Sequence, residues 1–177
     1  MHQTKARMIL RDAPVMWRRI NSIGVILDCN STYACALGYP KQEIIGRPVF
    51  EHVPKDSWQA MNNSLKEWFE TGKVTDQRIT FLRSDGTTFL ALLHATSIYD
   101  ESENLLGSNT IIFEAGKMDG SDIAVYKEFF RAASDTLDAI GKKDYHAMDD
   151  ESRSEYDGLK KCFEMVGSVA LEPGKGL

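Results

Sequence analysis

The sequence contains no long hydrophobic run. Within residues 1–14 the only apolar stretch covers residues 8–10. A membrane-spanning helix needs about 20 apolar residues, and the core of a signal peptide needs about 7–15. We therefore expect neither feature and no membrane partner.

Cysteine and histidine are scarce and irregularly spaced. Cys29, Cys35 and Cys162 form no CxxC pair, and the four histidines are scattered. A sparse, odd set of cysteines is typical of reduced thiols in the cytosol, so we expect a cytoplasmic location. Cys35 is expected to be a small buried residue. No zinc site or other metal site is predicted.

Basic charge is in short supply. The chain has 21 Lys and Arg against 26 Asp and Glu, which gives a formal net charge of -5. A nucleic-acid binder usually shows a basic face, so the composition predicts no nucleic-acid partner. Most of the acidic excess follows residue 116, which is where a basic protein partner would meet the chain.

Motifs of common enzymes are also missing. The sequence has no GxxxxGK[ST] phosphate loop, no GxSxG elbow and no HExxH motif. The region after the last predicted strand is too short for the ATP-binding domain of a histidine kinase. We predict no kinase, nucleotide-binding or hydrolase activity, and no catalytic residue.

Helix and strand signals alternate along the first two thirds of the chain. A short N-terminal helix ends at Ala13-Pro14, and residues 16–30 read as a hairpin. Helices are predicted at 31–36, 41–45 and 57–71, and strands at about 74–82, 87–99 and 105–114. This order predicts an α+β domain with one antiparallel sheet and helices on one face. Structural roles as a helix cap, two helix stops and a turn are assigned to Asn30, Gly38, Gly46 and Gly86.

The strand predicted at 87–99 is apolar at both alternating positions. An antiparallel strand with one wet face should alternate between apolar and polar residues. We therefore expect the outer face of the sheet to be covered by the N-terminal helix, the C-terminal region or a second subunit.

The C-terminal region carries two apolar seams at helical spacing. Gly141-Lys142-Lys143-Asp144 is expected to interrupt the helix between them, and both a hairpin and one bent helix fit the pattern. The first seam has the spacing of a coiled coil and favours a homodimer interface; packing on its own domain is an equal alternative. The interface residues of this hypothesis are Ile123, Tyr126, Phe130, Ala133, Leu137 and Ile140.

Several short motifs in residues 16–116 occur in an order that resembles a PAS sensor domain. They are Gly24-Val-Ile-Leu-Asp-Cys-Asn30, Leu37-Gly38-Tyr39, Glu43-Ile-Ile-Gly46, Asp85-Gly86 and Leu106-Gly107. The resemblance implies a five-stranded antiparallel sheet in the order 2-1-5-4-3, with helices that enclose a pocket. The predicted division is an N-terminal helical cap at 1–15, the PAS-like domain at 16–116, a C-terminal helical extension at 117–171 and a flexible tail at 172–177.

The sequence identifies no cofactor. It departs from the motifs of two cofactor-binding subgroups of the family that it resembles. Flavin-binding light sensors carry a reactive cysteine where this chain has Val49, so covalent flavin photochemistry is not expected. Haem-binding PAS domains usually take a histidine from the long helix, and the helix predicted at 57–71 has none. Histidine-ligated haem is therefore not expected either.

The resemblance implies signal transduction, through a small ligand, dimerisation or both, with flanking helices that pass the signal to a downstream protein. The alternative is an interaction scaffold whose core is filled and holds no ligand. The residues predicted to line a pocket are Phe50, Met61, Leu65, Phe69, Phe81, Phe89, His94, Thr96 and Ile111.

Overall fold

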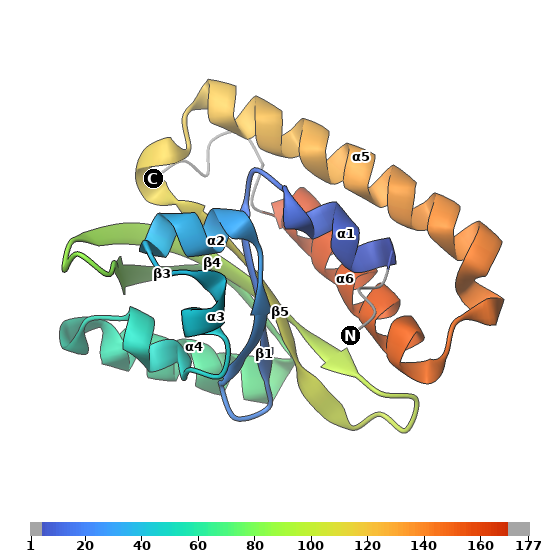
Figure 1. Ribbon diagram of the computed structural model, residues 1–177, viewed down its shortest axis with the longest axis horizontal. Helices are drawn as coiled ribbons and strands as arrows, with labels where there is room; N and C mark the ends of the chain where they lie inside the picture. Colours follow the sequence, from blue (N-terminus) through green and yellow to red (C-terminus); the bar gives the residue numbers. More distant parts are fainter. Residues whose placement is uncertain (1–4, 170–177) are drawn as a thin grey trace.

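A computed structural model describes residues 5–169, and a five-stranded antiparallel sheet lies at its centre (Figure 1). The strand order is β2-β1-β5-β4-β3, as the resemblance implied. The strands are β1 (Met16–Asn21), β2 (Ile26–Cys29), β3 (Lys73–Leu82), β4 (Thr88–Tyr99) and β5 (Leu105–Glu114). The predicted tail at 172–177 lies outside the described residues.

Three helices cover one face of the sheet, which we call the inner face (Figure 1). They are α2 (Ser31–Leu37), α3 (Lys41–Ile44) and α4 (Trp58–Thr71), with short 3-10 turns between α3 and α4. In α4 the buried residues Met61, Ser64 and Trp68 recur at intervals of three and four. This spacing places them on one side of the helix, against the sheet.

Asn30, Gly38 and Gly46 lie at the ends of the short inner helices, and Gly86 lies in the turn between β3 and β4. The Asn30 side chain accepts a hydrogen bond from the Tyr33 backbone, which caps α2. Gly38, Gly46 and Gly86 have φ angles of 74°, 85° and 84°, a left-handed conformation that glycine adopts without strain. Asn30 also donates to the carbonyls of Leu10 and Val15, so the same side chain fixes the entry into β1.

The opposite, outer face of the sheet is covered by the same chain. The covering helices are α1 (Lys5–Arg11), α5 (Gly120–Asp144) and α6 (Asp150–Val169) (Figure 1). Helix α6 packs directly on β4 and β5. From Ala91 to Ile98 every residue of β4 is buried. The apolar character of both faces of this strand therefore reflects two helical layers, one on each side.

The C-terminal region is a helical hairpin, the first of the two arrangements that the sequence left open. The seam residues Tyr126, Phe130, Ala133 and Leu137 are buried inside the chain, against α6 and the sheet. Ile140 packs against the same cluster, and Ile123 is half-buried. The hypothesis that this seam forms a homodimer interface is therefore corrected, because α6 and the sheet already occupy it.

Gly141 does not interrupt the helix, contrary to the sequence-based expectation. Helix α5 continues through it to Asp144, and the break falls at residues 145–147. A side chain at Gly141 would place its Cβ 2.2 Å from the Tyr156 hydroxyl oxygen. That hydroxyl donates to the Leu137 carbonyl at 2.9 Å. Glycine is needed here for the close approach of Tyr156 and not to end the helix.

No helix in residues 5–169 is long and apolar enough to cross a bilayer.

The hairpin contact predicts opposite effects for one substitution at two helical glycines. Alanine is normally better than glycine in a helix by about 1 kcal/mol. Gly167→Ala meets nothing within 4 Å, so it should be neutral or stabilising. Gly141→Ala should instead lower the free energy of unfolding by about 2 kcal/mol, because it displaces Tyr156 and its hydrogen bond. Urea unfolding of both variants measures the difference; equal stabilisation by both would contradict the contact.

Candidate functional site

A small cavity lies on the inner face, between α4 and the sheet. Its volume is about 20 Å³. This is room for about one water-sized species. The lining residues come from α4 and four strands: Arg18, Ile20, Met61, Ser64, Leu65, Trp68, Val74, Leu93, Ala95, Ser108 and Thr110.

Arg18 is the charged residue of this lining and is 2% exposed. It lies in the middle of β1, where Met16, Arg18 and Ile20 alternate toward the inner face. One guanidinium nitrogen, Nη1, donates to the Tyr33 hydroxyl at 3.1 Å. The guanidinium carbon lies 5.8 Å and 5.6 Å from the ring centres of Tyr33 and Phe81. Its Nε has no hydrogen-bond partner among the described residues.

The titratable groups around Arg18 are held in their neutral forms. Burial raises the pKa of Tyr33, and burial raises the pKa of the Cys29 thiol to about 11. Burial, followed by the charge of Arg18, lowers the pKa of His52 to about 4. The His52 ring contacts Tyr33 through Nδ1, 3.2 Å from the hydroxyl. At neutral pH these three neighbours therefore add no negative charge beside Arg18.

A second buried polar atom in the cavity lacks a partner. The Ser108 hydroxyl is fully buried and makes no hydrogen bond within residues 5–169. Ser64 and Thr110 add two more hydroxyl groups to the lining. The cavity thus combines apolar walls with several polar groups and one cation, a composition typical of a small-ligand site.

Five of the predicted pocket residues lie on the inner face, and two of them line the cavity. Met61 and Leu65 point into it from α4. Phe81 and Phe89 stack on each other with ring centres 5.6 Å apart, and Phe50 packs at the edge of the inner cluster. These three rings fill the interior beside the cavity.

The other four predicted pocket residues lie elsewhere, and the prediction is corrected for them. Phe69 is 55% exposed, because Trp68 takes the inward position of α4. His94, Thr96 and Ile111 are buried under the outer helices. A strand that is apolar at both alternating positions does not reveal which set of side chains faces inward, and here Leu93 and Ala95 do.

His94 is fully buried on the outer face. Its Nδ1 accepts a hydrogen bond from the Asp76 backbone at 3.2 Å, and its ring lies edge-on to Phe113. Burial lowers the pKa of His94 to about 4, although the Asp76 carboxylate acts in the opposite direction. His94 is therefore a neutral core residue on the side of the sheet away from the cavity.

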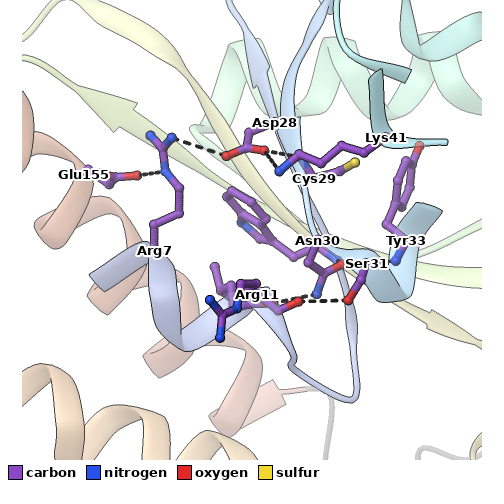
Figure 2. Close-up of polar contacts among 11 residues, drawn as sticks. Arg7, Arg11, Asp28, Cys29, Asn30, Ser31, Tyr33, Lys41 and Glu155 are labelled. Carbon is purple, nitrogen blue, oxygen red and sulfur yellow. Dashed lines mark hydrogen bonds and ion pairs between the residues drawn. The ribbon is translucent and has the colours of Figure 1, made fainter. Parts of the chain in front are cut away.

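An open groove of about 540 Å³ lies between α1 and α2. Arg7 joins Asp28 at 3.2 Å and also pairs with Glu155 of α6, while Lys41 lies 2.5 Å from Asp28 (Figure 2). Arg7 and Lys41 thus both face acidic side chains of the same chain. Cys35 borders this groove and is exposed, so the expectation that it is buried was wrong.

The polar lining of the inner cavity was not predicted from the sequence. Arg18, Ser64, Ser108 and Thr110 were not assigned to a pocket, although Arg18 shares its alternation with Met16 and Ile20. A charged residue between two inward-facing apolar residues of a strand is the signal that could have identified it. No group of three or more metal-ligating side chains occurs in the part of the chain that the structure describes.

The two buried histidines predict a loss of stability in acid. Both have pKa values lowered to about 4 in the folded state, so the unfolded state binds more protons as pH falls below about 6.5. Each histidine should cost about 3 kcal/mol of folding free energy between pH 6.5 and 4. Urea unfolding across this range should show His94→Gln with a shallower decline than the wild type. The exposed His146 provides the control, since His146→Gln should keep the wild-type slope; the same slope in His94→Gln would refute the assignment.

Comparisons with known proteins agree with the geometry. The family model described as PAS domain matches residues 13–114. A PAS domain from Colwellia psychrerythraea is 21% identical, with a TM-score of 0.56 over 60% of this chain and 91% of that one. A PAS domain of a LuxR-family transcriptional regulator from Burkholderia thailandensis, solved in complex with ethanol, is 18% identical. Its TM-score is 0.52, over 62% of this chain and 96% of that one.

The PAS-B domain of Drosophila melanogaster Cycle, solved with bound ethylene glycol, is also 18% identical. It has a TM-score of 0.52 over 56% of this chain and 98% of that one. A search of curated proteins finds no match. PAS domains are generally signal-sensing modules. With its sheet order, its inner helices and a family match over more than half its length, this chain belongs to the PAS domain family.

Proposed function

We propose that the chain is a sensor in which the inner cavity receives a small ligand and the α5–α6 hairpin passes the signal to a downstream protein. The observation that carries this proposal is the double burial of β4 and β5. The same two strands line the cavity with one set of side chains and hold α6 with the other.

The two sets alternate residue by residue. On β4, Leu93 and Ala95 face the cavity, while His94 and Thr96 face the outer helices. On β5, Ser108 and Thr110 line the cavity and Asn109 lies on the other side. A displacement of either strand by an occupant of the cavity moves the surface on which α6 rests.

Close packing makes α6 sensitive to such a displacement. A Cβ at Gly158 of α6 would lie 3.1 Å from Ile98 and 3.3 Å from the Asn109 amide nitrogen. Two polar atoms below the outer helices, His94 Nε2 and Asn109 Nδ2, have no hydrogen-bond partner in the described chain. Buried polar atoms without partners weaken an interface. The hairpin thus packs closely on the sheet, and a small movement of the strands would disturb this contact.

The size of the cavity favours a ligand of few atoms. Ethanol and ethylene glycol, with which the two PAS domains named above were solved, are small molecules but are larger than a water-sized species. A cavity of about 20 Å³ is far smaller than a flavin or a haem would fill.

The coupling can be tested by filling the cavity from the helix side. Ser64→Val adds apolar volume from α4, which lies across the sheet from α6. We expect hydrogen exchange of α6 amides to accelerate several-fold beyond any change in global stability, because the strands between them must shift. Exchange measured by mass spectrometry over Asp150–Val169 gives the result.

Asn62→Val is the matched control, since it introduces the same residue at an exposed position of the same helix. It should leave α6 exchange unchanged. Identical α6 protection in the two variants would overturn the coupling and support the scaffold without a ligand. Native mass spectrometry and thermal shifts with a library of small metabolites test the sensing step separately.

A further inference from the structure

We infer that the ligand of the inner cavity is a small monovalent anion, about the size of a halide ion, held by Arg18. The signalling role of this anion rests on the function proposed above. Its binding rests on three independent observations: an uncompensated buried charge, the unpartnered donors of the cavity and the size of the cavity.

The first observation concerns charge. The guanidinium group of arginine is a cation in proteins. Arg18 is 2% exposed, and within residues 5–169 no carboxylate forms an ion pair with it. An isolated buried charge is costly, and buried charges in proteins are paired as a rule. Its aromatic neighbours Tyr33 and Phe81 offset part of this cost without neutralising the charge.

The nearest acidic residue along the sheet is committed to other partners. Asp28 lies in β2, next to the Cys29 that pairs with Arg18 across the strands. Its two carboxylate oxygens face Lys41 and Arg7, on the side of α1 (Figure 2). Cys29, Tyr33 and His52 are neutral at pH 7, so none of these three neighbours supplies the missing charge.

The second and third observations concern donors and space. Arg18 Nε and the Ser108 hydroxyl both lack partners, and both residues line the same cavity. Two donors on residues that line a space for one water-sized species suit an anion better than water, since one of them carries a full charge. The apolar walls from Met61, Leu65 and Leu93 favour a weakly hydrated monovalent ion over sulfate or phosphate.

Anion titrations of the full chain test this inference. Sodium chloride, bromide or formate replaces sodium gluconate at constant ionic strength, because gluconate is too large for the cavity. The melting temperature of the wild type should rise and saturate with chloride and bromide, as binding to the native state requires. A saturating rise with formate as well would extend the site to the carboxylate group of small organic acids.

Two variants separate binding at Arg18 from general salt effects. Arg18→Met should remove the saturable rise and, in gluconate, should be as stable as the wild type or more so, since it removes an unpaired buried charge. Arg78→Met, at an exposed position of β3, is the charge-matched control and should keep the wild-type response. An equal response of Arg18→Met and the wild type, or no saturable response in the wild type, overturns the inference and leaves the cavity to water.

Ser108→Ala keeps the test decisive if Arg18→Met does not fold. It should raise the half-saturating bromide concentration roughly tenfold, through loss of one hydrogen bond to a charged group. An unchanged half-saturating concentration would contradict the site. Crystals grown in bromide should show an anomalous peak beside Arg18, and a peak confined to the surface counts against it.

The outcome is distinguishable from that of the proposed function. If bromide binds but leaves α6 exchange unchanged, the anion site stands and the signalling role fails. If Ser64→Val alters α6 exchange while no anion binds, the coupling stands and the identity of the ligand is wrong.

Discussion

The central strands β4 and β5 are buried on both faces, and the rest of the structure follows from this constraint. Helices α2, α3 and α4 enclose a core on the inner face of the sheet, and the outer side chains need a second cover. In this chain Leu92, Ile111 and Phe113 project outward beneath the aromatic residues of α5 and α6. Leaving such a surface in water would forgo a large share of the hydrophobic stabilisation. The C-terminal hairpin is therefore part of the folded unit and not an appendage to it.

Helix α1 ties the two layers together through charge. Arg7 pairs with Asp28 of β2 on one side and with Glu155 of α6 on the other (Figure 2). Arg19 of β1 lies 3.8 Å from Glu155. The Glu155 side chain is only 4% exposed, and a buried carboxylate is stabilised by ion pairs such as those with these two arginines. Burial lowers the pKa of Arg19 and Glu155 counteracts that shift, which shows how closely their charges are balanced. The hairpin is thus positioned on the sheet by specific ion pairs as well as by apolar contact.

The sequence predicted those features that local chemistry controls. Asn30 caps a helix and Gly38 ends it, because the groups that decide both lie within a few residues of them. The sheet order came from the resemblance, and periodicity alone does not provide it. Gly141 was misread because glycine is a helix stop only when no distant residue needs the space, and here Tyr156 does. His94 and Thr96 were misplaced for a similar reason: the inward face of a strand apolar on both sides is decided by its neighbours.

Buried polar groups differ between the two sides of the sheet. On the outer side the atoms without partners, on His94 and Asn109, belong to neutral groups, whose burial costs a moderate amount of free energy. On the inner side Arg18 carries a charge, whose burial without a partner costs far more. In the inference above, binding a counter-ion on the inner side would relieve this cost. In the proposed function a signal would then pass from the cavity to the hairpin through β4 and β5, because both strands line the cavity and hold α6.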